Sequence, residues 1–207
     1  SAAVPPEATE RVRSYAARGG WALQVVDAGE LADPAYAANP VDRCYFCKTD
    51  LYGAIRRHTD WPMASGANLD DLGDFRPGLR AAGQHGVRHP LVEAGIDKAT
   101  VRALAAEEGL DDLAELPASP CLSSRIETGT MVTVERLKLV LEVERLLRRE
   151  FPRATARCRL RASGVVVELD EATLAGLAEP DALARRIADA HGLAEPVVIA
   201  AYSRGSA

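Results

Sequence analysis

A change of pattern near residue 130 constrains the fold more than any other feature of this sequence. Before it, helical patterns alternate with short apolar segments, an order typical of a parallel sheet covered by helices. After it, one long helical pattern leads into two strand patterns separated by a turn, which indicates a small α+β unit. We therefore predict an α/β domain over residues 1–130 and an α+β domain over residues 131–207.

The first domain is expected to alternate three helices with two short strands. Gly19-Gly20 and Gly109 should end the first and third helices, because glycine readily takes the left-handed conformation at a helix end. The side chain of Asp97 is expected to cap the start of the third helix. The predicted elements are helices at 6–18, 44–58 and 98–108 and strands at 21–26 and 63–67.

The second domain is expected to begin with its longest helix. Two alternating segments follow it and are expected to form a hairpin across Ser163-Gly164. Two further helices and a last strand should complete the unit. The predicted elements are helices at 134–150, 172–177 and 180–191 and strands at 155–162, 165–169 and 196–202.

The charge of the chain narrows the classes of function. Its 207 residues carry a net charge of −5, which argues against broad binding of nucleic acid and leaves small anions open as ligands. No apolar run reaches the roughly 18 residues of a membrane helix, and residues 1–12 lack the basic and then apolar order of a signal peptide. We expect a cytoplasmic protein without a membrane partner.

The four cysteines are too few for a disulfide scaffold in a chain of this length, so thiol or metal chemistry is the better expectation. Cys44 and Cys47 form a C-x-x-C pair at a predicted helix start, and Cys121 lies in a Pro-flanked, Ser-rich loop at 118–125. Cys158 falls on the apolar face of an alternating strand, which indicates a buried small side chain instead of a ligand.

Three thiolates without an evident fourth protein ligand suit a cubane iron–sulfur cluster whose remaining iron is open to an external ligand. A zinc site completed by His58 or His89 and a set of unmetallated thiols remain open alternatives. A thioredoxin-like redox pair is disfavoured, because Cys44 follows the irregular Asn39-Pro40 stretch and not a strand.

Three arginines, Arg157, Arg159 and Arg161, share one face of the predicted strand at 155–162. Guanidinium groups stay charged, so they would repel one another unless an anion or carboxylates lay against them. Glu144 falls on the apolar stripe of the preceding helix and needs a partner, for which Arg157 or Arg159 is expected. A solvated strand face and a surface glutamate are the alternatives.

The polar loop at 66–78 lies where an open α/β sheet presents groups to a ligand. Its carboxylates are candidates for the magnesium that accompanies ATP, because hard cations prefer carboxylate oxygen. The alternative for this loop is a capped turn into the next helix. For the candidate anion contacts outside the loop, the alternative is an ordinary surface position. The candidate residues are Asp70, Asp71, Asp74 and Arg76 in the loop, Lys98 and Arg102 on one helix face, and Ser124 and Arg125 beside Cys121.

Four ordered segments resemble one known family: RCYFCK at 43–48, the loop at 66–78, PLVEAGIDKATVRALA at 90–105 and CLSSR at 121–125. Over about residues 20 to 170 they are similar to the ATP-dependent sulfur transferases of the LarE type. This resemblance implies an incomplete Rossmann-like PP-loop ATP pyrophosphatase domain followed by a substrate-binding or oligomerisation domain. It also implies that ATP with magnesium adenylates a carboxylate of a nicotinate-derived mononucleotide before sulfur is transferred, in nickel-pincer cofactor biosynthesis.

The resemblance implies roles for single residues. Some members give up the sulfur of a cysteine at the position that Pro120 occupies here, so this chain is similar to the branch in which three cysteines carry a 4Fe-4S cluster. The family's arginine pair for the substrate phosphate falls on Arg157 and Arg159, and its substrate-site glutamate falls on Glu144. Family members tend to assemble, which implies a homo-oligomer. The implied cluster ligands are Cys44, Cys47 and Cys121.

Two departures from the family pattern limit what the resemblance implies. The SGGxDS phosphate loop occurs nowhere in these 207 residues, so we expect this polypeptide alone not to turn over ATP. Residues 126–129 also lack the Pro-Tyr pair that usually precedes the glycine. Two alternative functions stay open, a related PP-loop enzyme that thiolates tRNA and a non-catalytic cluster-binding fragment.

Overall fold

The computed structural model of the protein describes residues 1–117 and 119–203, which group into two compact units. Unit 1 consists of Ser1–Gln24, Ala37–Val41 and Cys121–Ala207, and unit 2 of Val25–Tyr36 and Asp42–Pro120. The domain boundary near residue 130, expected from the change of sequence pattern, stays a prediction. Among the described residues, none of the helices has the length and apolar character needed to cross a membrane.

The sheet of unit 1 has three strands in the order β1-β2-β3. β1 (Ala156–Arg161) and β2 (Gly164–Leu169) form the predicted antiparallel hairpin, with Arg161 opposite Gly164. Gly164 has a φ of 116°, a value that favours glycine at the end of this tight turn. β3 (Val198–Ala201) pairs with β2 in parallel, so the third strand predicted for this region is also confirmed.

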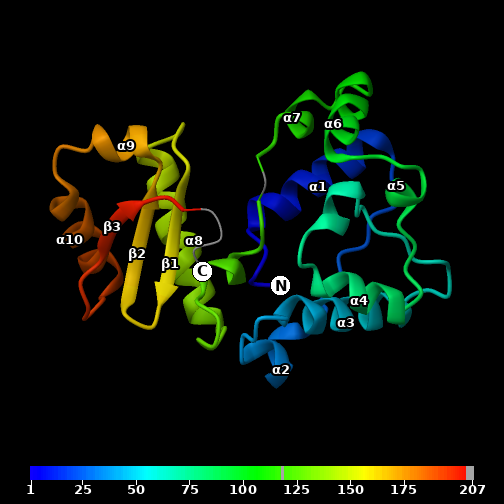
Figure 1. The fold of residues 1–207 in the computed structure, drawn as a ribbon, viewed down its shortest axis with the longest axis horizontal. Helices are drawn as coiled ribbons and strands as arrows, with labels where there is room; N and C mark the ends of the chain where they lie inside the picture. Colours follow the sequence, from blue (N-terminus) through cyan, green and yellow to red (C-terminus); the bar gives the residue numbers. More distant parts are fainter. Residues whose placement is uncertain (118, 204–207) are drawn as a thin grey trace. The chain divides into compact units, whose positions relative to one another are not determined.

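Helix α8 (Val134–Glu150) packs against β1, and α10 (Pro180–His191) packs against β3 (Figure 1). The apolar positions of α8 recur at helical spacing, and Leu137, Val140 and Leu147 have no exposed surface. They form one core with the buried face of the hairpin. The other helical elements of unit 1 are α1 (Pro6–Gly19), η3 (Leu122–Arg125) and α9 (Glu171–Ala175).

Unit 2 is mainly helical. Helices α3 (Arg43–Arg56) and α4 (Pro77–Gln84) lie side by side (Figure 1). Their core contains Tyr52, Met63, Ala81, Ala82 and Val87. The remaining elements are η1 (Glu30–Ala32), α2 (Pro34–Ala37), η2 (Leu69–Gly73), α5 (Pro90–Glu93), α6 (Lys98–Glu107) and α7 (Asp111–Ala114).

The predicted parallel sheet of the first domain is not formed by the described residues. Residues 21–26 make no strand, and the prediction there is wrong; residues 63–67 contribute a single parallel bridge, between Ala64 and Arg88. An apolar segment becomes a strand only when a neighbour accepts its backbone hydrogen bonds, and here Trp21 and Val25 are more than half exposed. The fold is therefore mixed α/β with a small sheet, and the Rossmann-like architecture stays a prediction.

Candidate functional site

The C-x-x-C pair lies in the first turn of α3. Cys44 and Cys47 are three residues apart on the helix, so both thiols project from neighbouring positions of one face. Cys44 is exposed and Cys47 is half-buried, and neither takes part in a disulfide. An external ligand can therefore reach this pair of cysteines, which belongs to unit 2.

Two side chains of helix α4, Arg80 and Gln84, hold the start of α3 through three contacts. The guanidinium of Arg80 lies 3.0 Å from Asp42 Oδ2 and stacks 4.1 Å from the ring centroid of Tyr45. The hydroxyl of Tyr45 lies 2.8 Å from Gln84 Oε1. These contacts join the turn that carries the two cysteines to the neighbouring helix.

Cys121 lies in unit 1, at the N-terminal end of η3. Its thiol is free and half-buried, whereas its carbonyl oxygen accepts hydrogen bonds from Ser124 Oγ at 2.8 Å and from Arg125 Nη1 at 3.3 Å. The backbone at Cys121 is thus fixed by two side chains of the same turn. Ala118, the first residue of the predicted loop at 118–125, lies outside the described residues.

Cys158 is fully buried, as the sequence predicted. Burial, and then the negative charge of Glu144, raise the pKa of its thiol far above the usual range, so it stays protonated. A protonated thiol in an apolar layer does not bind metal. Three accessible cysteines therefore remain.

The three predicted cluster ligands come from both units, with Cys44 and Cys47 in unit 2 and Cys121 in unit 1. Within residues 1–117 and 119–203 there is no group of three or more His, Cys, Asp or Glu side chains placed to hold a metal ion. The three-cysteine ligand set stays a prediction, as does the zinc alternative. Of its two candidate histidines, His89 places Nδ1 2.7 Å from Ser65 Oγ.

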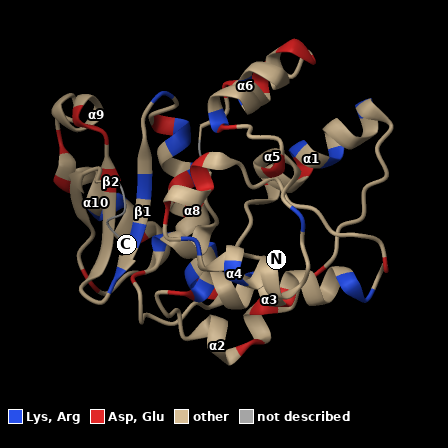
Figure 2. Cartoon of the chain, turned by 45° about the vertical axis from the view of Figure 1, so that its right-hand side comes forward, with Lys and Arg blue, Asp and Glu red and all other residues tan. Residues whose placement is uncertain are grey.

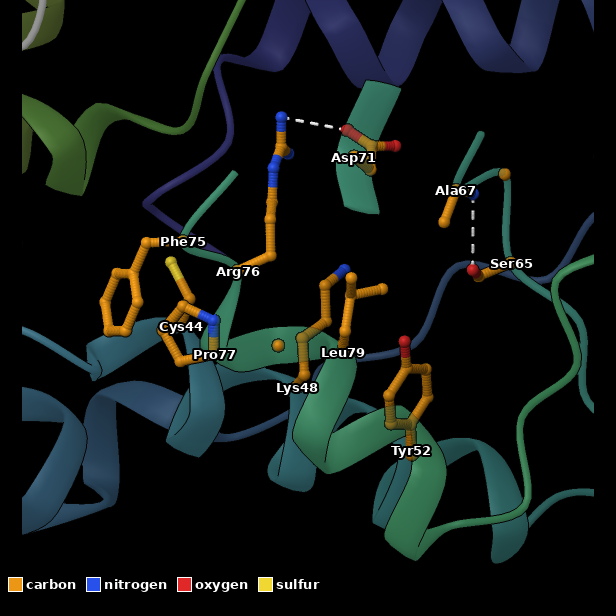
Figure 3. A pocket seen from close by; sticks show the side chains of 12 residues that line it. Cys44, Lys48, Tyr52, Ser65, Ala67, Asp71, Phe75, Arg76, Pro77 and Leu79 are labelled. Atoms are coloured by element: carbon orange, nitrogen blue, oxygen red, sulfur yellow. Dashed lines mark hydrogen bonds and ion pairs between the residues drawn. The ribbon is translucent and has the colours of Figure 1, made fainter. Parts of the chain in front are cut away.

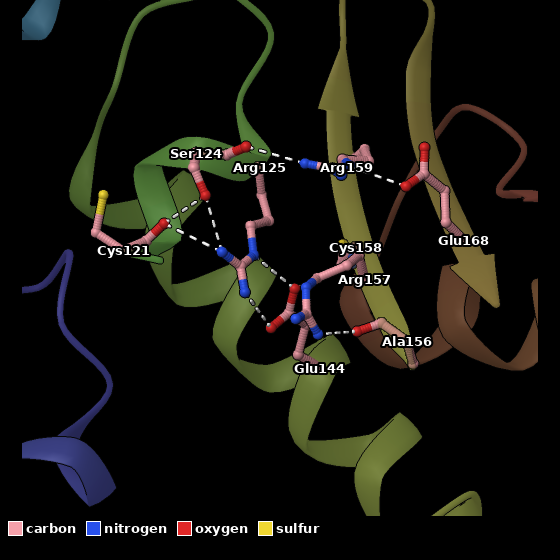
Figure 4. Close-up of polar contacts among 9 residues, drawn as sticks. All are labelled: Cys121, Ser124, Arg125, Glu144, Ala156, Arg157, Cys158, Arg159 and Glu168. Carbon is pink, nitrogen blue, oxygen red and sulfur yellow. Dashed lines mark hydrogen bonds and ion pairs between the residues drawn. The ribbon is translucent and has the colours of Figure 1, made fainter. Parts of the chain in front are cut away.

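Arg125 and Glu144 form a buried ion pair in unit 1 (Figure 4). Arg125 Nε lies 2.9 Å from Glu144 Oε1, and Nη2 lies 3.3 Å from Oε2. Glu144 Oε1 also accepts a hydrogen bond from the backbone N–H of Cys158. The expectation that Arg157 or Arg159 would be the ion-pair partner of Glu144 is wrong. Residue Arg125 of η3 takes this place, because two nitrogens of its planar guanidinium contact the two carboxylate oxygens of Glu144 on α8.

The arginines of β1 are partly neutralised by a second buried glutamate. Glu168 accepts from Arg159 Nε at 3.0 Å and from Arg161 Nη2 at 3.2 Å, and Arg159 also donates to the carbonyl oxygen of Ser124 (Figure 4). Arg157 donates to the carbonyl oxygen of Ala156, and no carboxylate of the described chain lies within 4 Å of it.

This arrangement leaves positive charge uncompensated on one strand. Burial, and then repulsion from Arg125, lower the pKa of Arg157. An anion placed against this half-buried guanidinium would remove that penalty. Figure 2 shows the basic residues along β1.

The aspartates of the 66–78 loop bind backbone amides. Asn68 and Asp71 form a capping box at η2, and Asp70 Oδ2 accepts from the N–H of Lys98 at 2.8 Å. Asp71 also pairs with Arg76 at 2.8 Å, and Asp74 accepts from the next N–H. The structure thus shows the capped turn that was the alternative for this loop, and magnesium binding stays a prediction.

The two other groups of candidate residues have different settings. Lys98 is the first residue of α6 and is exposed, and Asp97 caps this helix as predicted by accepting from the N–H of Thr100. Arg102 donates to the carbonyl oxygen of Leu116. Ser124 and Arg125 instead belong to the buried network of unit 1.

Unit 2 contains a cavity of about 340 Å³ that sequence reasoning missed (Figure 3). Its wall includes Cys44, Lys48 and Tyr52 from α3, Ser65 from the segment before the loop, and Asp71 and Arg76 from the loop. The spacing of four between Cys44, Lys48 and Tyr52 was a usable signal, because residues four apart share a helix face.

Comparison with known proteins gives three informative relatives. An uncharacterized protein of Synechocystis sp. is 41% identical over 70% of this chain, and one of Methanocaldococcus jannaschii is 28% identical over 64%. The pyridinium-3,5-bisthiocarboxylic acid mononucleotide synthase of Lactiplantibacillus plantarum is 32% identical over 81% of this chain. The chain spans 53% to 62% of the length of these relatives. No protein-family model matches the chain.

Proposed function

We propose that this chain is part of an ATP-dependent sulfur transferase of the LarE type, acting on a nicotinate-derived mononucleotide in nickel-pincer cofactor biosynthesis. The observation that carries the proposal is its 32% identity, over 173 residues, with an enzyme named as the synthase of the bisthiocarboxylic acid mononucleotide. Because the chain spans 62% of that relative, the reaction of the whole enzyme is an inference. The proposal includes a cytoplasmic homo-oligomer.

Cys44, Cys47 and Cys121 are the proposed ligands of a 4Fe-4S cluster. The donor set fits, because these thiols are exposed or half-buried, whereas Cys158 is buried and protonated. A cluster held by three thiolates supplies one open iron for an external sulfide. Arg125 and Ser124 hold the carbonyl of Cys121 and would keep the third thiol in a fixed orientation.

Arg157, supported by Arg159, is the proposed contact for the substrate phosphate. Of the three arginines of β1, Arg157 is the one without a carboxylate within 4 Å among the described residues, and planar guanidinium groups bind phosphate through two parallel hydrogen bonds. The resemblance implies that Glu144 contacts the substrate. We propose instead that its carboxylate positions Arg125, to which it is bound.

The proposed reaction has two covalent steps. A substrate carboxylate oxygen attacks the α-phosphorus of ATP, and magnesium pyrophosphate leaves. A sulfide then attacks the acyl carbon with its own electron pair, the bond to the adenylate oxygen breaks, and AMP leaves with that bond's electron pair to give a thiocarboxylate. The proposed contacts for ATP and magnesium are Asp70, Asp71, Arg76 and Lys98 of unit 2, whereas Ser124 and Arg125 are bound to each other, and Arg125 to Glu144, inside unit 1.

A paired assay tests the proposal. ATP–pyrophosphate exchange and thiocarboxylate formation are measured on the chain alone and on the chain joined to a domain that carries an SGGxDS phosphate loop. We expect both activities only in the joined protein, and an Arg157→Met variant should raise KM for the mononucleotide. Absence of substrate-dependent exchange in a folded joined protein would favour the non-catalytic alternative, and a gel shift with tRNA would favour the thiolation of tRNA.

A further inference from the structure

Asn39 is fully buried and has a backbone conformation that few side chains adopt. It has no exposed surface, and its φ of 55° lies in the left-handed region, which asparagine enters more readily than most residues. A buried amide must find hydrogen-bond partners, because an unsatisfied polar group in the interior is costly. The partners of Asn39 therefore show what this residue holds in place.

The side-chain amide of Asn39 binds the loop that follows η3. Its nitrogen donates to the carbonyl oxygens of Ile126 at 3.2 Å, Glu127 at 2.8 Å and Thr130 at 3.0 Å. An amide nitrogen carries two hydrogens, so the three oxygens share them. An ionised carboxylate of the same size could donate to none of them.

Two backbone hydrogen bonds complete this contact. The carbonyl oxygen of Asn39 accepts from the N–H of Gly129 at 2.8 Å, and that of Ala37 accepts from the N–H of Val132 at 2.8 Å. Residues 37–41 belong to unit 1, although the chain lies in unit 2 just before and just after them. These five hydrogen bonds, named here the Asn39 clamp, fasten that short segment to unit 1.

The loop that the clamp binds is itself anchored within unit 1. The N–H of Glu127 donates to the carbonyl oxygen of Leu160 in β1. The loop continues directly from η3, in which Leu122 and Ser123 are buried. Cys121, at the start of η3, therefore belongs to the same closely held segment as the acceptors of the clamp.

Only a short stretch separates the clamp from the C-x-x-C pair. Residues 40–42 link Asn39 to the start of α3, and Cys44 is the second residue of that helix. Five residues of extended chain span at most about 18 Å, so the Cα of Cys44 cannot lie further than this from the Cα of Asn39. The ring of Pro40 fixes one dihedral of the link and restricts it further.

We propose that Asn39 is a positioning residue for the three-cysteine site. By fastening the chain before the C-x-x-C pair to the loop after Cys121, it limits the distance between that pair and the third thiol. Asn39 acts through the backbone on both of its sides and binds neither cluster nor substrate. The clamp stands on the hydrogen bonds of unit 1, whereas its part in holding iron rests on the proposed function.

Two substitutions isolate the side chain of Asn39. Asn39→Gly keeps the left-handed φ and removes the three amide hydrogen bonds, and Asn39→Asp keeps the size and removes the donors. The matched control is Ile187→Ala, which opens a cavity in the core of the same unit and removes no hydrogen bond of the clamp. Circular dichroism confirms that each variant is folded.

Thiol cross-linking tests the positioning without iron. In a parent chain that carries Cys47→Ala and Cys158→Ala, a short bis-maleimide should link Cys44 to Cys121 within one molecule. We expect both Asn39 variants to slow this reaction about tenfold, because the effective concentration of one thiol at the other falls. Ile187→Ala should react at the parent rate, and a monofunctional maleimide should modify each thiol equally fast in all variants. An unchanged rate in folded Asn39→Gly, or no cross-link in the parent, would overturn the proposal.

The retention of iron separates this proposal from that of the cluster. After anaerobic reconstitution of the chain with all four cysteines, we expect Asn39→Gly to lose iron to a chelator about tenfold faster than the wild type. If the wild type binds no iron while the cross-link still depends on Asn39, the cluster proposal fails and the positioning role stands. If the cluster forms and both proteins release iron at the same rate, the positioning role fails and the cluster proposal stands.

Discussion

In unit 1 the charged side chains nearest the core are buried and paired, whereas in unit 2 the lysine that lines the cavity has no carboxylate partner among the described residues. Arg125 is 3% exposed and Glu144 6%, and their contact joins η3 to α8. Lys48 and Tyr52 instead direct a cation and a hydrogen-bond donor into a cavity of about 340 Å³. The difference is that Arg125 and Glu144 join two elements of unit 1 through a buried ion pair, whereas Lys48 of unit 2 takes part in no ion pair among the described residues.

The two units also differ in their cores. Unit 1 packs a sheet face and long aliphatic side chains such as Leu137 and Leu147, which have no exposed surface. Unit 2 packs two helices around Ala81 and Ala82, with Tyr52 reaching the cavity. We expect unit 1 to be the more rigid body and unit 2 to respond more strongly to a ligand.

The strongest test of this comparison removes one partner of the buried pair. Glu144→Ala leaves Arg125 buried without its carboxylate, and breaking such a pair costs about 3–5 kcal/mol of unfolding free energy. Chemical denaturation measures the loss. Glu142→Ala, which removes a solvent-accessible partner of Lys138 and His191 on the same helix, should cost less than about 1 kcal/mol. Equal losses would show that the buried pair is not structural.

A second test compares the reactivity of the thiols. Alkylation of the native chain with iodoacetamide at pH 8 should modify Cys44 first, because it is exposed, and should not modify Cys158 until the chain unfolds. We expect a rate ratio of about a hundredfold or more, read by mass spectrometry of the peptides. Rapid native labelling of Cys158 would mean that the layer between α8 and the sheet opens readily.

The smallest expected effect concerns an acidic cluster in unit 2. Burial, and then the charges of Asp33 and Glu30, raise the pKa of Asp50. A raised pKa in the folded state costs nothing below the pKa of the unfolded state, about 4, and lowers stability as the pH rises through the folded value. Asp50→Asn should therefore stabilise the chain at pH 7, by less than about 1 kcal/mol, and lose this advantage near pH 3.

Denaturation at both pH values checks the prediction. The exposed Asp60→Asn variant serves as the control and should show no such pH dependence. A gain for Asp50→Asn that persisted unchanged at pH 3 would contradict the explanation from burial and repulsion.

Local patterns in the sequence were sufficient for most elements. The hairpin of β1 and β2 follows from alternation and a short turn, and α8 follows from apolar residues at helical spacing. The prediction of a strand at 21–26 failed because an apolar alternation does not show whether a neighbouring strand exists. Pairing with a second strand in the folded chain decides whether such a segment becomes a strand. No described residue forms strand hydrogen bonds with residues 21–26.

The sequence indicated which residues belong to the candidate site, but it did not indicate which of them contact one another. The sequence indicated a buried Cys158 and a Glu144 that needs a partner, but the choice of Arg125 over the arginines of β1 depends on how η3 meets α8. The cavity was missed for a related reason. The stripe of Cys44, Lys48 and Tyr52 is visible in the sequence, yet only the placement of α4 encloses it.

The most direct test of the central claim is the content of iron and acid-labile sulfide after anaerobic reconstitution, with the absorption spectrum, for the wild-type chain and for Cys121→Ala. Cys158→Ala is the matched control, because that thiol is buried in the same unit. We predict that the wild type and Cys158→Ala bind iron and sulfide in equal amounts and that Cys121→Ala loses both. A folded Cys121→Ala variant with the full iron and sulfide content would contradict the three-cysteine site.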